Sequence, residues 1–395
     1  MMKILSVNAG SSSLKFQLFE MPEEKVIASG LIERIGLPAS IITVTTNGDK
    51  RRTVEDIQDH AKAVQKVLSV LLDLSIVASL DEIKGVGHRV VHGGEKFSDS
   101  VLITDEVITE IDKLSELAPL HNPANLIGIK AFQKVLPNVK QIAVFDTAFH
   151  QTMPIESYLY PAPYSWYVKY GVRRYGFHGM SHKYVSERAY KLLGKGPEGT
   201  RLITIHLGNG ASVTAIRDGK SVETSMGFTP LVGLMMGTRS GDVDPSILPF
   251  VMQKENCSFE DTLNALNYES GLKGISLASS DMRDILKGVN EGNKQCILAF
   301  NLYIKRVCDY IGQYYILLGG CDALVFTAGI GENSGQTRKA IIDRLAALEI
   351  KLDEEANKVM GKESIVTKPD SKIKVLVIPT NEELVIARDT LRLIS

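Results

Sequence analysis

Two stretches of the chain, about half its length apart, share one pattern of apolar and polar positions. Residues 3–20 (KILSVNAGSSSLKFQLFE) and residues 201–219 (RLITIHLGNGASVTAIRDG) each lead from an apolar strand through a glycine-bearing turn into a second strand. A third short strand is expected after each hairpin, over residues 26–32 and 220–224. Placing Ser13 on Ser212 gives an offset of 199 residues, close to half of the 395. The pattern favours two related α/β halves over two hairpins that are alike by chance.

The segments between and after these hairpins alternate between strand-like and helical spacing. QIAVFD (residues 141–146) and DALVFTAG (residues 322–329) are apolar runs of strand length. Over residues 297–314 apolar side chains recur along a long segment that Lys305, Arg306 and Asp309 interrupt, which predicts a core helix and excludes a membrane span. The aromatic, proline-bearing residues 158–167 are expected to form the irregular connection after the first half.

The turn of the first hairpin, VNAGSSSLKF (residues 7–16), gathers small hydrogen-bond donors and one cation. Ser11, Ser13 and Lys15 are spaced two residues apart, so their side chains can share one face of a strand. Gly10 permits a tight turn whose successive N–H groups, together with Asn8, form a concave anion site. The turn therefore predicts contact with phosphate, and an exposed hairpin tip carrying one lysine is the alternative.

Two further glycine turns have the context of a nucleotide site. LGNGAS (residues 207–212) matches the first turn, and TAGIGENS (residues 327–334) lies between a strand and an amphipathic run. Backbone donors at the start of a helix suit phosphates, although strand-glycine-helix turns also occur in many α/β proteins without a ligand. The sequence has no GxxxxGK[ST] and no HRD or DFG motif, so neither a P-loop enzyme nor a protein kinase is supported.

Two acidic residues are candidates for binding Mg²⁺. Asp146 ends a strand-like run, and ligands of open α/β sheets gather beyond the carboxyl ends of strands. Near the end of the chain, Thr380 and Glu383 fit a capping box at the start of a helix, which gives Glu383 a structural explanation. Glu382 has no such explanation and is the better candidate for a metal or water-bridged contact, with an ordinary first-turn glutamate as the alternative.

Two arginines and several histidines complete the candidate chemistry. Arg89 falls in a mostly apolar strand and Arg239 in a glycine-rich loop, where their guanidinium groups could bind carboxylate or phosphoryl oxygens; surface salt bridges are the alternative. The pairs His88/His92 and His178/His182 have HxxxH spacing. The first pair lies in a segment that reads as a strand, and the second pair lacks the glutamate of an HExxH motif, so a zinc site is disfavoured. Histidines in YGFHG (residues 175–179) and PLHNP (residues 119–123) suit a small polar ligand instead.

The composition of the chain limits the classes of binding partner and the cellular compartment that are expected. The chain has 45 basic and 46 acidic side chains and no long run of like charge, so neither nucleic acid nor a membrane surface is indicated. The four cysteines have no zinc or disulfide spacing and read as reduced thiols. The N-terminus has only a short apolar run. A cytoplasmic protein is therefore expected.

The motifs VNAGSSSLKF, GHRVVHGGE, PLHNP, VFDTAFH, YGFHGMSH, HLGNGASV, GTRSGDVDP, GIGEN and TNEE follow one another along the chain. In these motifs, over essentially its whole length, the chain resembles the acetate kinase family of carboxylate phosphotransferases. The resemblance implies the α/β fold of sugar kinases, actin and the 70-kDa chaperones, with two ribonuclease H-like domains of duplicated βββαβα core and a nucleotide cleft between them. The expected domains are residues 1–148 with 384–395, and residues 149–383 with the adenosine site. A homodimer is also implied.

The resemblance further implies roles for particular residues. The catalytic set would be Arg89, Asp146, His178 and Arg239, with His121, His178 and Arg239 supporting the transition state. The acetate site would be formed by Arg89, Val91, Leu120, Phe177 and Pro230. ATP and its phosphates would contact Ser11, Ser13, Lys15, His206, Leu207, Gly208, Asn209, Gly210, Asp281, Met282, Arg283, Gly329, Ile330, Gly331 and Asn333. Asn8 and Glu382 would support Mg²⁺ or Mn²⁺.

The reaction implied is reversible, Mg-dependent, in-line transfer of the γ-phosphoryl group of ATP to acetate, which gives acetyl phosphate and ADP. A carboxylic acid with a pKa of about 4 to 5 is ionised at neutral pH, so this acceptor needs no general base. A propionate or other short-chain acyl kinase is the nearest alternative, because one methylene in an apolar pocket discriminates by only about 10 to 200-fold. A sugar kinase or a nucleotide-switch protein on the same fold is a more distant alternative.

Overall fold

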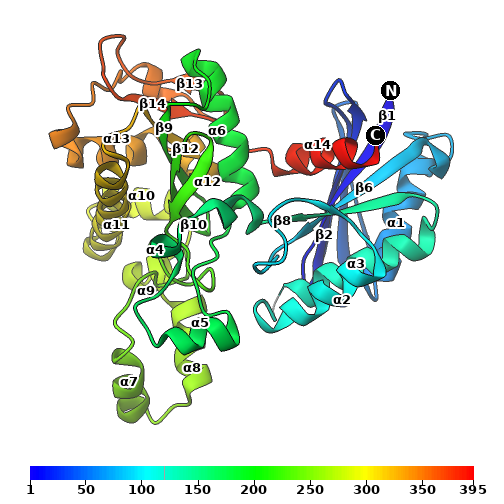
Figure 1. Ribbon diagram of the computed structural model, residues 1–395, viewed down its shortest axis with the longest axis horizontal. Coiled ribbons are helices and arrows are strands. Elements are labelled where there is room, and N and C mark those ends of the chain that lie inside the picture. Colours follow the sequence, from blue (N-terminus) through cyan, green and yellow to red (C-terminus); the bar gives the residue numbers. More distant parts are fainter. Residues whose placement is uncertain (120) are drawn as a thin grey trace. The chain divides into compact units, whose positions relative to one another are not determined.

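The computed structural model describes residues 1–119 and 121–395. The chain divides into two compact units, Met1–Ala148 with Asn381–Ser395, and Phe149–Thr380. The final segment belongs to the first unit from Asn381 onward, slightly before the expected residue 384, because Asn381 itself caps the last helix. Each unit is a mixed α/β structure built on its own sheet (Figure 1).

The first unit contains an eight-stranded sheet. Its strands are β1 (Met2–Ala9), β2 (Ser13–Met21), β3 (Lys25–Glu33), β4 (Ser40–Thr46), β5 (Asp49–Glu55), β6 (Ile83–Val90), β7 (Val101–Leu102) and β8 (Lys140–Phe145). They follow the order β5-β4-β3-β2-β1-β6-β8-β7. Strand β1 pairs antiparallel with β2 and parallel with β6, which pairs parallel with β8.

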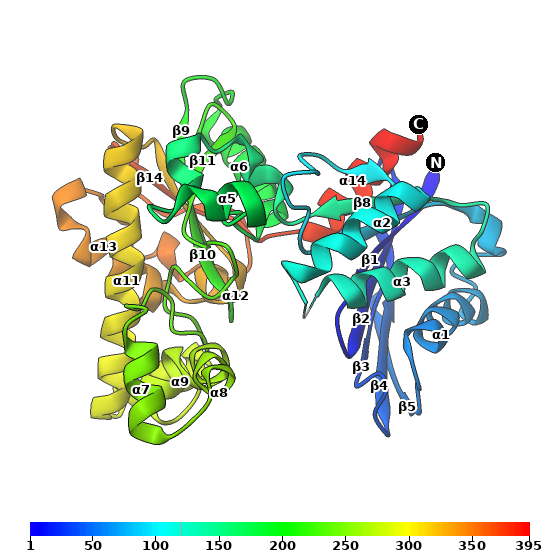
Figure 2. The same cartoon turned by 60° about the horizontal axis from the view of Figure 1, so that its bottom comes forward.

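Helices cover both faces of this sheet. They are α1 (His60–Asp73), α2 (Asp105–Lys113), α3 (Asn122–Val135) and α14 (Glu382–Ile394), with short 3₁₀ turns at Leu80–Glu82 and Leu114–Glu116. Helices α1 and α3 share a core with Leu5 and Phe16, and α14, red in Figures 1 and 2, crosses the other face over β1, β6 and β8. This close approach requires a glycine, since a Cβ on Gly87 would lie 2.4 Å from Cγ2 of Ile386.

The second unit contains a six-stranded sheet with the same core topology. Its strands are β9 (Arg201–Leu207), β10 (Ala211–Arg217), β11 (Lys220–Thr224), β12 (Ala323–Thr327), β13 (Ser364–Ile365) and β14 (Lys374–Val377), in the order β11-β10-β9-β12-β14-β13. Strand β9 pairs antiparallel with β10 and parallel with β12, which pairs parallel with β14. These pairings repeat those of β1, β2, β6 and β8, so the predicted duplication is confirmed.

The register of the two hairpins corrects the alignment expected from the sequence. Asn8 pairs with Lys15 in the first hairpin, and His206 pairs with Ser212 in the second. Lys15, and not Ser13, therefore occupies the position of Ser212. The turns differ in length, because the first is closed by a hydrogen bond from Gly10 to Ser13 and the second by one from Gly208 to Gly210. Because both turns are rich in glycine and other small residues, the sequence alone did not reveal this difference in turn length.

The second unit carries the larger set of helices. They are α4 (Ile155–Tyr158), α5 (Tyr164–Tyr170), α6 (Gly179–Leu193), α7 (Ile247–Glu255), α8 (Phe259–Asn264), α9 (Gly271–Ser276), α10 (Met282–Asn290), α11 (Lys294–Leu318), α12 (Ala328–Asn333) and α13 (Gly335–Arg344). A π-helical turn spans Ala265–Glu269, and 3₁₀ turns span Ala148–Thr152, Ala346–Leu348 and Ala356–Lys358. Helices α6 and α11 lie on opposite sides of the strands in Figure 1.

Three predictions about these helices have different outcomes. Helix α11 buries Tyr303, Val307 and Ile311 completely, which confirms the predicted core helix. The segment expected to be irregular is so only in part, since its end already belongs to α5. TAGIGENS, expected to be a turn, contains the short helix α12. Among the described residues, no helix is both long enough and apolar enough to cross a membrane.

Candidate active site

In the first unit, charged side chains gather beside the start of α14. Arg89 lies near the end of β6 and Asp146 directly follows β8. Nη2 of Arg89 lies 2.5 Å from Oδ2 of Asp146, its Nε lies 3.1 Å from both carboxylate oxygens, and its Nη1 lies 3.4 Å from Oδ1 of Asn8. Asp146 is buried, and the Arg89 side chain keeps 25% of its surface exposed. The carboxylate thus fixes the direction of a guanidinium group that remains accessible.

The start of α14 differs from the predicted capping box. Asn381 is the N-cap, and its side-chain oxygen accepts a hydrogen bond from the N–H of Leu384 at 3.0 Å. Glu383 forms an ion pair with Lys15 on β2 instead of bonding back to Thr380. The capping-box prediction is therefore wrong. Asparagine caps a helix as well as threonine does, and the lysine that attracts Glu383 is far away in the sequence.

Glu382 lies in the same charged cluster, and its pKa is higher than that of an ordinary glutamate. Burial is the main cause that raises the pKa of Glu382, to about 7; Arg89 lowers it, while Asp146 and Glu383 raise it further. For Arg89, burial lowers the pKa, but the charges of Asp146, Glu382 and Glu383 outweigh this and the net direction is upward. The cluster has three carboxylates and, with Lys15, two cations. A divalent cation would neutralise this surplus of negative charge.

Side chains alone do not complete a metal site here. Within residues 1–119 and 121–395, no group of three or more His, Cys, Asp or Glu side chains is arranged to hold a metal ion. Mg²⁺ commonly uses one or two protein oxygens and takes its other ligands from water and substrate phosphates. The residues near Glu382, with the amide oxygen of Asn8, fit that kind of site.

Other residues expected around the substrate in this unit lie on neighbouring elements. Val91, just beyond β6, is buried, and its N–H donates to Oδ1 of Asn125 on α3 at 3.1 Å. His121 directly precedes α3. Ser11 is exposed at the tip of the first turn, and Ser13 is half-buried at the start of β2. Leu120 lies outside the described residues.

In the second unit, His178 and Arg239 meet at the turn between β9 and β10. His178 directly precedes α6 with a φ of +57°, a left-handed conformation that is uncommon for residues other than glycine and clusters at functional sites. Its ring stacks on that of His206, with centroids 4.0 Å apart. A Cβ on Gly210 would lie 3.4 Å from both Nε2 of His178 and Nη1 of Arg239. The imidazole, the guanidinium group and the glycine turn are therefore neighbours.

Arg239 is a partly buried cation. Burial lowers the pKa of Arg239, and the nearby Tyr268 offsets this effect only in part. Its Nη1 lies 3.4 Å from the carbonyl oxygen of Pro230. Asp242 anchors the loop that carries it, accepting hydrogen bonds from the N–H of Gly233 at 2.9 Å and from the hydroxyl of Tyr310 at 2.5 Å. An anionic ligand would compensate the buried charge.

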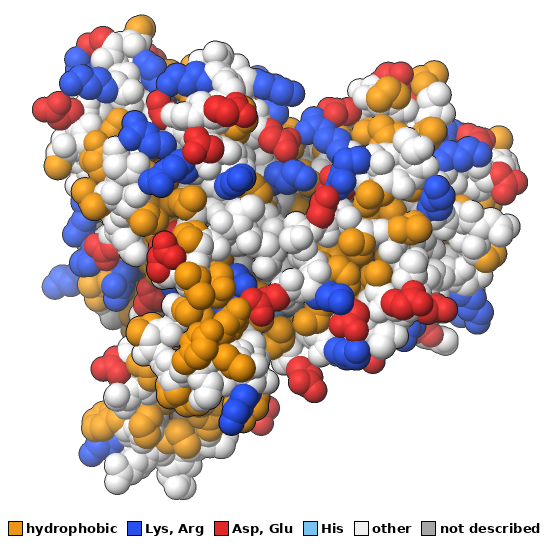
Figure 3. Space-filling view, in the orientation of Figure 1, with side chains coloured by type: hydrophobic (Ala, Val, Ile, Leu, Met, Phe, Trp, Pro, Cys, Tyr) orange, Lys and Arg blue, Asp and Glu red, His pale blue; other side chains and the backbone are white. Residues whose placement is uncertain are grey.

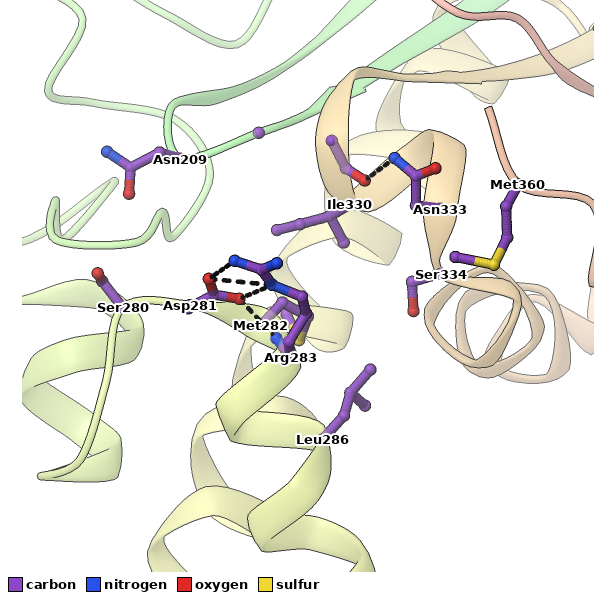
Figure 4. A pocket seen from close by; sticks show the side chains of 12 residues that line it. Asn209, Ser280, Asp281, Met282, Arg283, Leu286, Ile330, Asn333, Ser334 and Met360 are labelled. Atoms are coloured by element: carbon purple, nitrogen blue, oxygen red, sulfur yellow. Dashed lines mark hydrogen bonds and ion pairs between the residues drawn. The ribbon is translucent and has the colours of Figure 1, made fainter. Parts of the chain in front are cut away.

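The same turn forms part of the wall of a cavity of about 530 Å³ (Figure 4). This volume suits a small-molecule ligand. Asp281 caps α10 and accepts a hydrogen bond from the N–H of Arg283 at 2.8 Å, while the Asn333 amide donates to the carbonyl of Gly329 at 2.9 Å. The lining consists of Gly208, Asn209, Ser280, Asp281, Met282, Arg283, Leu286, Gly329, Ile330, Asn333, Ser334 and Met360.

This cavity brings together most of the residues expected to hold adenosine. Asp281, Met282 and Arg283 come from the start of α10, and Gly329, Ile330 and Asn333 come from α12. Leu207, His206 and Gly331, also expected near the nucleotide, are buried beside it and do not line the cavity. Phe177 is buried directly before His178.

A family model described as the acetokinase family matches residues 3–388 of this chain. The chain belongs to the acetokinase family. It is 58% identical to an acetate kinase of Geobacillus sp. (strain WCH70) over 393 residues, covering 100% of this chain and 99% of the relative. It is 56% identical to an acetate kinase of Bacillus subtilis (strain 168), with both chains fully covered.

Solved structures agree with this assignment. A Porphyromonas gingivalis acetate kinase superposes with a TM-score of 0.96 at 48% identity, and both chains are covered completely. A propionate kinase from Francisella tularensis subsp. tularensis SCHU S4 superposes with a TM-score of 0.94 at 41% identity, again over both whole chains. The acetokinase chain is therefore an enzyme, a kinase with the two-sheet α/β fold described above.

Several side chains that shape this acetokinase site could not be found from the sequence. Ser280, Leu286 and Met360 line the cavity but belong to no motif, and Ser334 ends TAGIGENS without having been assigned to the site. Arg338 is completely buried and donates to the carbonyl oxygens of Gly331 at 2.8 Å, Asn357 at 2.6 Å and Val359 at 2.9 Å, which ties α12 to the segment that carries Met360. In QTRKAII this arginine reads as an exposed helix residue, so no local signal identifies its role.

Proposed function

We propose that this protein is an acetate kinase that transfers the γ-phosphoryl group of ATP to acetate, reversibly and in line, giving acetyl phosphate and ADP. One observation carries the proposal. Gly208 and Asn209 line the cavity, and the next residue of the same turn, Gly210, lies against Arg239 and His178. Adenosine in the cavity would therefore direct its phosphates toward a partly buried cation and an imidazole.

The chemistry of the reaction matches these groups. Acetate is ionised at neutral pH, so the enzyme needs no base to activate it. The barrier comes from bringing two anions together and from charge that develops on the equatorial oxygens of the transferring group. Arg239 and His178 would stabilise those oxygens, and Arg89, aimed by Asp146, would hold the acetate carboxylate and the transferring group. Lys15, Ser11 and Ser13 would contact phosphate oxygens.

The charged cluster at α14 fits a divalent cation. Glu382 supplies a carboxylate and Asn8 an amide oxygen, and the surplus acid in the cluster favours a bound cation. When bound, Mg²⁺ or Mn²⁺ neutralises phosphate charge and helps to fix the direction of transfer. Asp146 contributes by holding Arg89, since both of its oxygens already accept from that guanidinium group.

The choice of acid depends on a small apolar pocket. We assign Val91, Leu120, Phe177 and Pro230 to the methyl group of acetate. A propionate or other short-chain acyl kinase remains the nearest alternative, since one methylene is worth only about 10 to 200-fold in discrimination. A sugar kinase would need a carboxylate base against a hydroxyl, whereas Asp146 is occupied by Arg89. A nucleotide switch would bind ATP without acid-dependent turnover.

The experiment that tests the function measures acyl phosphate, trapped as hydroxamate, from Mg-ATP with acetate, propionate or butyrate. Acetate-dependent product that Arg89→Ala abolishes would support the proposal, and the ranking of the three acids would identify the substrate. Arg51→Ala, an exposed arginine on β5, is the matched control and should keep full activity. A folded protein that binds ATP but forms no acyl phosphate from any acid would refute it.

We further propose that the protein is a cytoplasmic homodimer. Helix α5 exposes a row of apolar side chains, including Tyr164 at 62%, Val168 at 65% and Tyr170 at 67%. Figure 3 shows apolar surface over this part of the second unit. Exposed apolar patches often mark protein interfaces, and a second copy would cover this one. Light scattering should give twice the chain mass, reduced by Trp166→Glu and unchanged by Lys169→Glu; a monomeric wild type would contradict the proposal.

A further inference from the structure

A continuous chain of hydrogen bonds lies behind His178 in the second unit. Oγ1 of Thr204 lies 2.7 Å from Nδ1 of His182, Nε2 of His182 lies 2.8 Å from Oγ of Ser212, and Oγ of Ser212 lies 2.9 Å from Nδ1 of His178. Thr204, His182 and Ser212 are all completely buried. The two histidines of HGMSH thus meet at one serine hydroxyl.

The direction of each hydrogen bond follows from the number of protons available. The Thr204 hydroxyl has one proton and two neighbours, Nδ1 of His182 at 2.7 Å and the carbonyl oxygen of Thr214 at 3.5 Å. Of these two acceptors Nδ1 of His182 is much the nearer, and we assign the proton to that contact, an assignment that nitrogen-15 NMR tests. Burial, with smaller effects of His150 and His206, lowers the pKa of His182 well below its usual value, and this imidazole is therefore neutral.

The remaining protons are then fixed in sequence. A neutral His182 that accepts at Nδ1 carries its proton on Nε2 and donates it to Ser212. Ser212 accepts that bond and uses its own proton for Nδ1 of His178. His178 in turn accepts at Nδ1, which leaves its proton on Nε2, the ring nitrogen next to Gly210 and Arg239.

We infer that Thr204, His182 and Ser212 are positioning residues that hold His178 neutral with its proton on Nε2, so that a neutral imidazole donates to the transferring phosphoryl group. This inference rests on the proposed function of His178. The charged and titratable groups around the ring favour the neutral form. Nη1 of Arg239 and Nε2 of His178 both lie beside Gly210, His206 stacks on the ring of His178, and His182 with His150 lies behind it. A cationic His178 would repel the nearby guanidinium group.

The first test observes the proton directly. Nitrogen-15 NMR of the whole protein, labelled at its eight histidines and assigned with His178→Gln, reports the protonation of each ring nitrogen. At pH 7.5 we expect Nε2 of His178 to carry a proton and Nδ1 to be an acceptor. A proton on Nδ1, with or without one on Nε2, would overturn the inference.

The second test asks whether the hydroxyl of Ser212 acts as a donor or only fills space. Ser212→Ala removes the donor, and Ser212→Cys keeps the volume with a weak donor. We expect kcat to fall by about 10 to 100-fold in both variants, with the KM of ATP and acetate within about 2-fold of wild type, because the donor supports a group that acts in the transition state. A cysteine variant with wild-type kcat would overturn the inference and indicate packing alone.

The experiment also needs a matched control variant and a criterion that separates this inference from the proposed function. Ser186 is a buried serine on α6 whose hydroxyl donates to the carbonyl of Lys183 at 2.7 Å, and Ser186→Ala should leave kcat unchanged. If Ser212→Ala does not fold, the cysteine variant and the wild-type NMR spectrum still decide the question. Absence of acyl phosphate formation by wild type would refute the proposed function, whereas an active enzyme with His178 protonated on Nδ1 would refute only this inference.

Discussion

The hairpins β1-β2 and β9-β10 occupy equivalent places in the two sheets but handle charge differently. In the first, Lys15 lies opposite Asn8 and forms an ion pair with Glu383 at the start of α14. In the second, Ser212 occupies the equivalent position opposite His206 and bonds to two imidazoles. The duplication gave both units the same arrangement of strands. The first copy presents a network of charged groups, and the second a network of neutral hydrogen-bonded groups beside the partly buried Arg239.

This difference has a physical reason. Around Lys15 the groups are partly exposed, with 48% of the Lys15 side chain accessible, so water and ligands can share the charge. Ser212, His182 and Thr204 are completely buried, where neutral hydrogen-bonded groups cost far less than isolated charges. Five experiments test whether the two hairpins differ in this way.

Removing the guanidinium group of Arg239 in the second unit should have the largest effect. For Arg239→Ala we expect kcat/KM to fall by about 1,000-fold or more, because an arginine that meets developing phosphoryl charge contributes about 1,000 to 100,000-fold. Arg239→Lys should recover only part of this activity, since a lysine cannot form the planar fork. Steady-state kinetics with acetate and ATP measures both, and a loss below 10-fold for the alanine variant would contradict the role.

Lys15→Ala tests the corresponding position in the first unit. We expect kcat/KM to fall by about 10 to 100-fold, while the free energy of unfolding changes by less than about 1 kcal/mol, because exposed ion pairs add little stability. Kinetics and urea unfolding are measured on the same sample. Lys50→Ala on the exposed strand β5 is the control. A large loss of stability without loss of activity would mean that Lys15 is structural.

The pH dependence of stability tests the charged cluster. The pKa of Glu382 is raised to about 7 from 4.5, so the folded protein binds this proton more tightly than the unfolded chain does. That contribution is complete below pH 4.5 and is lost as the pH rises toward 7. Glu382→Gln should therefore gain stability relative to wild type, by about 1 to 2 kcal/mol, between pH 5 and pH 8. Urea unfolding without nucleotide or metal measures this, and parallel pH profiles would contradict it.

A smaller effect is expected from the anchor of the Arg239 loop. Tyr310→Phe removes the hydroxyl that donates to Asp242 and should lower kcat by about 3 to 10-fold through looser placement of Arg239, consistent with one hydrogen bond of about 1 kcal/mol. Tyr315→Phe, five residues further along α11, is the control. Unchanged kcat for Tyr310→Phe would show that the loop is held by other contacts.

The smallest effect concerns the cavity. Met360 lines it while remaining 63% exposed, so Met360→Ala should raise the KM of ATP by only about 2 to 4-fold and leave kcat unchanged. Calorimetric titration with ADP should show the same ratio. A fall in kcat without a change in KM would place Met360 outside the nucleotide site.

Much of the fold could be read from local patterns. The strands around residues 3–20 and 201–219, the core helix α11 and the repeated topology all follow from periodicity and glycine placement. The candidate site was accessible in the same way wherever a motif carried it, as with Arg89 and His178, whereas the residues at the start of α10 were expected only from the family resemblance. Local patterns did not identify the distant side chains that these residues contact. Nothing near Ser212 indicates His182, and nothing near Lys15 indicates Glu383.

Strand and turn preferences act over a few neighbouring residues, so local sequence was enough to predict the two hairpins, the α/β class and the set of polar side chains of the site. The folded structure was needed to show that Lys15 replaces Ser13 as the counterpart of Ser212, that Asn381 caps α14, and that Asp146 binds Arg89. Those outcomes depend on turn length and on contacts between residues that are distant in the chain. Such contacts form only when the sheet has brought its strand ends and its last helix together, and burial there sets which groups stay charged and which stay neutral.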